Sequence, residues 1–175
     1  YFLTFVKILY LISVTIFEDN KHLRETFRLL LSHAEGFSCS GAYPDCNNML
    51  DDLTANPSDV VLMDIEMPGM NGIEAVRLIK QAVPDTQILM QTVFEDDDRV
   101  FDSICAGASG YILKNFLNTK LVDSINELQY GGSPMSPSIA RKVLNKMQSV
   151  SAIIKPEETP DYRLTTREKE VLSCL

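Results

Sequence analysis

The sequence predicts an α/β fold built on a five-stranded parallel sheet. Short runs of apolar and β-branched residues recur along the chain, and an amphipathic helical pattern follows each of them. The run at 60–63 is apolar throughout, which is typical of a strand buried on both faces of a parallel sheet. Acidic residues, a threonine and a lysine stand at the ends of four such runs, where strands would leave the sheet.

Five segments are predicted as strands because they are rich in apolar and β-branched residues and end at turn residues. The third is the clearest, since it reaches Asp64 and a Pro-Gly turn follows it. The second has the weakest pattern. The segments are 11–17, 37–43, 60–64, 87–92 and 109–113.

The segments between these strands have the apolar spacing of helices. The first helix carries apolar positions from Leu23 to Ala34, and Gly36 is expected to end it in a left-handed cap. We expect Asp45 to cap the second helix. That helix would turn four side chains inward, those of Cys46, Met49, Leu50 and Leu53.

The later helices have capping signals of their own. Asn71 and Glu74 form a capping pair for the third helix. The acidic run 96–98 precedes the fourth helix, where the helix dipole favours negative charge, and Gly107 ends it. The fifth helix begins near Asn118.

This alternation predicts a doubly wound sheet, because crossovers between parallel strands are overwhelmingly right-handed. We expect the flavodoxin-like (CheY-like) strand order 2-1-3-4-5, followed by a linker helix. In this order the first and third strands are neighbours at the point where the strand order reverses. Glu18, Asp19 and Asp64 would therefore meet at one edge of the sheet.

Composition limits the class of function. The 175 residues suffice for one full domain and part of another, and 45% hydrophobic residues supply a core. The net charge of −8 argues against a nucleic-acid-binding face on this segment. The four cysteines form no C-x-x-C pair and fit a reduced, cytoplasmic protein with buried thiols. His22 and His33 fall in one predicted helix and offer no metal cluster.

The two ends of the chain differ from its middle. Residues 1–17 are almost wholly apolar but fit neither a membrane-spanning helix nor a signal peptide. We assign the first domain to residues 11–131, and residues 1–10 to an extension or to an extra strand or helix. Residues 132–163 are predicted as a linker with a short helix, and residues 164–175 begin another helix with a capping box at Thr165 and Glu168.

Three carboxylates at one edge repel one another by about 4 kcal/mol per pair at 4 Å and an effective dielectric of 20. A hard divalent cation such as magnesium (Mg2+) would relieve this repulsion. A carboxylate beside such an ion is a plausible nucleophile toward phosphorus, which makes Asp64 the candidate phosphoryl acceptor. Lys114 would add positive charge, and the hydroxyl of Thr92 would bond a phosphoryl oxygen. No Gly-rich phosphate loop occurs, so no nucleotide cofactor is expected.

These motifs resemble the receiver domain of bacterial two-component response regulators. They are Glu18-Asp19, Asp64-Ile-Glu-Met-Pro-Gly-Met-Asn-Gly72, Thr92 and Gly110-Tyr-Ile-Leu-Lys114. Residues 136–150 and 164–172 resemble the linker helix and the opening of the LuxR-type helix-turn-helix of the NarL/FixJ subfamily.

The resemblance implies that Asp64 accepts a phosphoryl group from a sensor histidine kinase. Asp19 and Asp64 would bind Mg2+ with the backbone carbonyl of Glu66, while Glu18 would act through water. Thr92 and Tyr111 would form the switch pair. From spacing alone, Tyr111 could equally be an ordinary half-buried aromatic residue.

Further expectations concern output. Phosphorylation would bias the fourth helix and fifth strand, and either that face or the first and fifth helices would form a homodimer. Only the first helix of the DNA-binding domain falls within the sequence, so we expect no specific DNA binding by this chain. We also expect no membrane association.

Two departures from the family pattern matter. Glu18 replaces the more usual Asp, and its longer arm alters the ion geometry. Val93 is bulkier than the residue often found there, and we predict that it restricts access to the phosphate and slows its hydrolysis.

The sequence leaves two alternative functions open. One is a Mg2+-dependent phosphatase or phosphotransferase with an Asp nucleophile, although no cap-sized insertion occurs. The other is a receiver-like binding module that never takes phosphate, against which the complete set of site residues argues.

Overall fold

The computed structural model describes residues 11–93 and 96–153. Its five strands form one parallel sheet in the order β2-β1-β3-β4-β5, which confirms the predicted topology. All five lie within one residue of their predicted bounds. They are β1 (Ile12–Phe17), β2 (Phe37–Tyr43), β3 (Val60–Asp64), β4 (Gln87–Thr92) and β5 (Gly110–Leu113).

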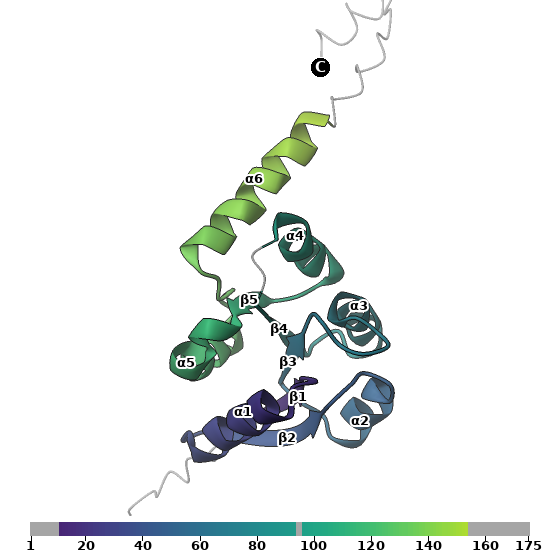
Figure 1. The fold of residues 1–175 in the computed structure, drawn as a ribbon, viewed down its shortest axis with the longest axis vertical. Coiled ribbons are helices and arrows are strands. Elements are labelled where there is room, and N and C mark those ends of the chain that lie inside the picture. Colours follow the sequence, from purple (N-terminus) through teal and green to yellow (C-terminus); the bar gives the residue numbers. More distant parts are fainter. Residues whose placement is uncertain (1–10, 94–95, 154–175) are drawn as a thin grey trace, which may run out of the picture.

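Helices cover both faces of this sheet (Figure 1). One face carries α1 (Lys21–His33) and α5 (Leu117–Gln129). The other carries α2 (Met49–Ala55), α3 (Gly72–Ala82) and α4 (Asp97–Ala106). Each face buries its own apolar cluster, and β3 contributes alternate residues to the two clusters because its side chains point to opposite faces.

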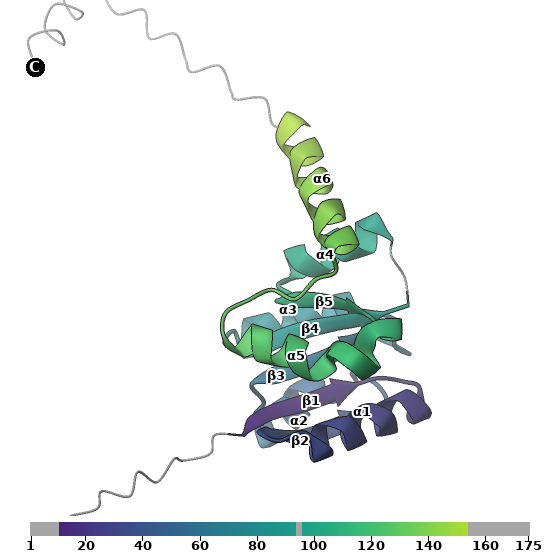
Figure 2. The same cartoon turned by 90° about the vertical axis from the view of Figure 1, so that its left-hand side faces the viewer.

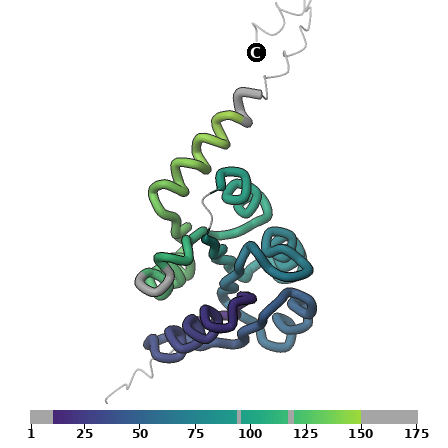
Figure 3. Tube along the Cα trace, viewed as in Figure 1, coloured from purple at the N-terminus to yellow at the C-terminus, as the bar shows by residue number. Residues whose placement is uncertain are grey.

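A sixth helix, α6 (Pro137–Ile153), packs beside α4 and extends beyond it (Figure 2 and Figure 3). Ile139 of α6 is fully buried in the cluster on the α4 face. Two ion pairs, Lys142–Asp97 and Lys146–Asp98, join α6 to the first turn of α4. The helix continues to Ile153, three residues past the 136–150 segment that resembles a linker helix, and no glycine or proline interrupts it before Pro156.

Three local predictions were wrong. Asp45 does not cap α2: its Oδ1 accepts from Asn47 N–H at 2.9 Å, and α2 begins at Met49 after Asn48. Leu50 is 38% exposed rather than turned inward, whereas Met49 and Leu53 of the same helix are buried. Gly36 has φ +86° but stands in the turn before β2, after α1 has ended at an extended Ala34.

The expectation of buried thiols also needs correction. Cys46 is buried, Cys39 is half-buried and Cys105, on the outer side of α4, is exposed. Cys174 and the capping box at Thr165 and Glu168 lie outside the described residues, as do residues 1–10. Among the described residues, no helix is both long enough and apolar enough to cross a membrane.

The junction between β3 and α3 depends on a glycine. Gly72 is the first residue of α3, and its N–H donates to Ile65 O at 2.9 Å. A Cβ at this position would lie 1.9 Å from the backbone oxygen of Asp64. Glycine therefore lets α3 approach the end of β3 and fixes the backbone on which Asp64 stands.

Candidate functional site

Three carboxylates meet at the carboxyl edge of the sheet, as predicted. Glu18 and Asp19 follow β1, Asp64 ends β3, and one ligand oxygen of each lies within 4.8 Å of the others. Glu18 is fully buried, Asp64 is almost fully buried and Asp19 is exposed. Two of the three carboxylates are thus buried, and the cluster is open to solvent at Asp19.

Lys114 reaches into this cluster from the end of β5. Its Nζ lies 2.6 Å from Asp64 Oδ2 and 2.8 Å from Glu18 Oε2. The side chain of Lys114 is 11% exposed, so solvent screens these contacts only weakly. Positive charge is therefore supplied directly to the two buried acids, which confirms the predicted convergence of strands 1, 3 and 5.

Burial and the shared ammonium of Lys114 shift the pKa values of the two buried acids in opposite directions. Burial raises the pKa of the Asp64 carboxyl above its ordinary value, despite the opposing hydrogen bond from Lys114. Burial likewise raises the pKa of the Glu18 carboxyl, and the charge of Asp64 adds to the shift. Burial alone would lower the pKa of Lys114, but its bonds to Asp64 and Glu18 outweigh burial and raise it.

This donor set fits a hard cation. Three carboxylate oxygens close together, one of them on an exposed residue, match the oxygen ligands and partial hydration that Mg2+ prefers. The cation would also add positive charge beside the three carboxylates, two of which share the ammonium of Lys114. The residues present therefore suit the metal that the sequence predicts.

Of the two other predicted residues, Glu66 contacts the cluster and Val93 directly follows β4. The Glu66 N–H donates to Asp64 Oδ1 at 3.3 Å, while the Glu66 side chain turns outward to Arg99 Nη1 at 2.7 Å. A pocket of about 610 Å3 opens beside this ion pair and Asp19. Val93 follows β4 and is 67% exposed.

Thr92 and Tyr111 form a direct pair. Tyr111 lies on β5, is fully buried and shares a side-chain hydrogen bond with Thr92 at the end of β4. Burial raises the pKa of the Tyr111 phenol to about 12. The ring therefore faces the interior with its hydroxyl beside Thr92, rather than lying half-buried.

Sequence reasoning missed one residue of the site. Gln91 is fully buried on β4, and its Nε2 donates to Glu18 Oε2 at 3.0 Å. The available signal was a polar residue directly after the apolar run Ile88-Leu-Met90, in a strand predicted to be buried. A buried amide in such a place requires a polar partner.

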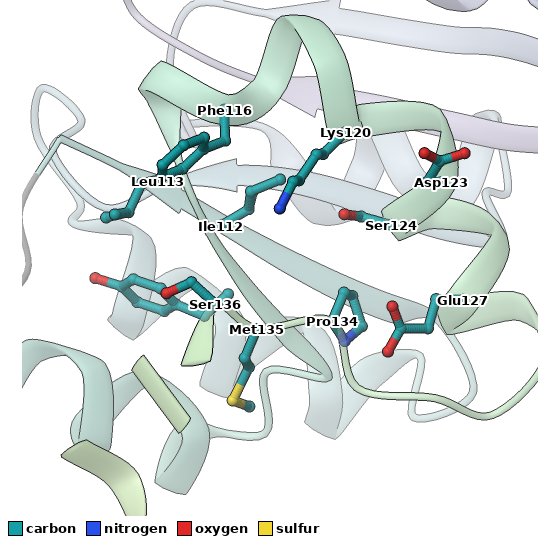
Figure 4. A pocket seen from close by; sticks show the side chains of 11 residues that line it. Ile112, Leu113, Phe116, Lys120, Asp123, Ser124, Glu127, Pro134, Met135 and Ser136 are labelled. Carbon is teal, nitrogen blue, oxygen red and sulfur yellow. The ribbon is translucent and has the colours of Figure 1, made fainter. Parts of the chain in front are cut away.

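A second pocket, of about 280 Å3, lies away from the acids between β5, α5 and the segment 134–136 (Figure 4). Lys120 and Glu127 of α5 line it opposite Met135. Tyr111 N–H donates to Pro134 O at 2.9 Å, and Tyr111 bridges to Met135 as a strand would. The pocket therefore lies where β5 contacts the segment that leads into α6.

Comparison with known proteins agrees with this geometry. The family model of the response regulator receiver domain matches residues 14–126, and the chain belongs to this family. It is 33% identical over 161 residues to the transcriptional regulatory protein YxjL of Bacillus subtilis, covering 92% of this chain and 73% of that protein. It is 32% identical over 165 residues to LiaR of the same species, covering 94% and 76%.

A solved structure has the same fold. The crystal structure of a LuxR-family two-component response regulator from Aurantimonas sp. SI85-9A1 superposes with a TM-score of 0.72 at 29% identity. The match covers 78% of this chain and 97% of that one. The two relatives are thus transcriptional regulatory proteins, and the solved structure is that of a LuxR-family response regulator.

Proposed function

We propose that this chain is a phosphorylation-activated response regulator in which Asp64 accepts a phosphoryl group from the phosphohistidine of a sensor histidine kinase. The supporting observation is the Asp64 carboxylate, 2.6 Å from Lys114 Nζ and grouped with Glu18 and Asp19. A carboxylate oxygen of Asp64 attacks phosphorus as the P–N bond to the histidine breaks. The bond's electron pair leaves with the imidazole.

Asp19 and Asp64 would hold Mg2+ together with the backbone carbonyl of Glu66, and Glu18 would act through water. When bound, such an ion would neutralise charge that develops on the phosphoryl oxygens. Lys114 adds positive charge at Asp64, where its Nζ already contacts Oδ2. Catalysis of phosphoryl transfer depends mainly on positioning the reacting groups and neutralising the phosphoryl charge, and less on covalent chemistry by the protein.

Thr92 and Tyr111 would transmit the change. A phosphoryl group on Asp64 brings about two negative charges and strong acceptor oxygens. The Thr92 hydroxyl would turn to donate to one of these oxygens and would give up its present bond with the buried Tyr111 hydroxyl. Since Tyr111 also donates its N–H to Pro134, this exchange would reach the segment that leads to α6.

The output would be transcription, through a LuxR-type DNA-binding domain that follows the receiver, in the cytoplasm. The named relatives YxjL and LiaR, both transcriptional regulatory proteins, support this assignment. The domain division proposed is a receiver at 11–131, a linker with its helix at 132–163 and the start of the helix-turn-helix at 164–175.

Phosphorylation would promote a homodimer. Between the two surfaces considered, an apolar hollow of about 540 Å3 across α1 and α5 supports the first-and-fifth-helix face. Leu29 and Leu30 of α1 and Val122 of α5 line it, and Leu29 is 48% exposed. The α4 face is already occupied in part by α6.

The proposal is tested with acetyl phosphate and Mg2+, followed by intact mass measurement. One acid-stable, base-labile phosphoryl group per chain is expected, absent in Asp64→Asn and retained in Asp51→Asn, which changes an exposed carboxyl of α2. Steady turnover of a small phosphate ester would instead favour an Asp-dependent phosphatase. Failure of the wild type to take any phosphoryl group would favour a binding module.

A further inference from the structure

The buried amide of Gln91 has no part in the mechanism just described, although it lies inside the acidic site. Gln91 stands directly across from Asp64 in the register of β3 and β4. Residues in register on neighbouring strands point to the same face, so the row at this level runs from Glu18 through Asp64 to Gln91. The hydrogen bond from Gln91 to Glu18 therefore crosses over β3, the strand that bears the phosphoryl acceptor.

The contacts of Glu18 show how tightly this carboxylate is held. Its Oε2 accepts from Gln91 Nε2 at 3.0 Å and from Lys114 Nζ at 2.8 Å. Its Oε1 accepts from the backbone N–H of Asn20 at 3.1 Å. Both oxygens of a fully buried carboxylate thus have donors, whereas Asp19 remains exposed and turned to solvent.

The orientation of the amide follows from charge. Gln91 Oε1 is buried without a hydrogen-bond partner among the described residues. Rotating the amide by half a turn would place this oxygen against the carboxylate oxygen of Glu18, where two acceptors repel. A buried amide oxygen without a hydrogen bond destabilises the fold. The hydrogen bond from Gln91 Nε2 to the charged Glu18 carboxylate is strong enough to offset this cost, because hydrogen bonds to charged groups are stronger than those between neutral groups.

We infer that Gln91 is a positioning residue that fixes the longer side chain of Glu18 for cation binding. The bond draws Glu18 Oε2 back across the sheet toward β4 and Lys114, which leaves Asp19 and Asp64 to face the cation. Glu18 then contributes through water rather than by crowding the metal. This inference rests on the proposed Mg2+ site but not on phosphoryl transfer.

The experiment is Mg2+ titration of the unphosphorylated protein by isothermal calorimetry, in the wild type and in Gln91→Leu. Leucine has similar volume and suits a buried strand, so the variant should fold, and Gln91→Met serves as a second isostere. Outer-shell partners of metal ligands typically contribute about 10–100-fold in metal affinity. We expect a weakening of Mg2+ binding of about this size in both variants.

A double-mutant cycle separates positioning from packing. In a Glu18→Asp background the shorter carboxylate cannot reach Gln91, so adding Gln91→Leu should leave the Mg2+ affinity of Glu18→Asp unchanged. Equal losses in the two backgrounds would overturn the inference, as would unchanged or tighter binding in Gln91→Leu alone. A wild type that binds no Mg2+ would contradict the proposed metal site itself, and phosphorylation of Asp64 by acetyl phosphate would then be judged separately.

Discussion

Removing the ammonium of Lys114 should destabilise the fold strongly. In Lys114→Met two buried carboxylates, Glu18 and Asp64, lose the cation that now lies 2.8 and 2.6 Å away. Coulomb's law gives about 6 kcal/mol for each attraction at an effective dielectric of 20, and the desolvation of the charges offsets much of it. Breaking buried ion pairs from one side costs about 3–5 kcal/mol, and we expect a loss of this size at neutral pH without Mg2+.

The pH dependence gives the sharper test. Burial already raises the pKa values of Glu18 and Asp64 in the folded state above their ordinary values of 4.5 and 3.8. Such groups favour the folded state at low pH, and this contribution is lost as the pH rises through the folded pKa. Removing Lys114 raises both pKa values further, so the gap between variant and wild type should be smallest near pH 4 and largest near pH 8.

The assay is urea unfolding followed by circular dichroism across this pH range, with and without Mg2+. Lys146→Met is the matched control, because Lys146 makes an ion pair of the same 2.6 Å length with Asp98 but at the surface. It should change stability little at any pH, whereas Mg2+ should restore part of the loss in Lys114→Met. A loss in Lys114→Met that is absent, or that does not vary with pH, would refute the reasoning.

Three further outcomes are expected. Val93→Ala should shorten the half-life of the aspartyl phosphate several-fold in a hydrolysis time course, and an unchanged or longer half-life would count against the shielding role of Val93. Tyr111→Phe should lower unfolding free energy by about 1 kcal/mol through loss of the bond to Thr92, and should remove a phenol that titrates at about pH 12 by ultraviolet absorbance. Reversing the charge at Lys142 or Asp97 alone should loosen α6 from α4 and speed the amide hydrogen exchange of α6, and reversing both charges should restore protection. Equal exchange rates in all forms would argue against a role for this ion pair in holding α6.

The sheet could be predicted from sequence because its determinants are local. An apolar run that ends in a charged residue specifies both a buried strand and the point at which it leaves the sheet, as at Asp64 and Lys114. Right-handed crossovers place helices on both faces, and the expected flavodoxin-like strand order, which the structure has, brings the acids together. The candidate site follows from topology and needs no knowledge of side-chain packing.

The remaining features depend on contacts that sequence spacing does not encode. The bond from Gln91 to Glu18 joins strands that are not neighbours, so only the register across β3 reveals it. The inward position of Tyr111 depends on its side-chain rotamer, which sequence spacing does not determine. The cap at Asp45 failed because that side chain closed an earlier turn, which competes with capping for the same oxygen.

The central claim is that Asp64, among the three clustered acids, is the group that takes phosphate. The most direct measurement treats the protein with acetyl phosphate and Mg2+, reduces it with borohydride and maps the modified residue by peptide mass spectrometry, because borohydride converts an aspartyl phosphate to homoserine. Homoserine is expected at position 64 alone. Reduction at Asp19 or Glu18, or at none of the three, would contradict it.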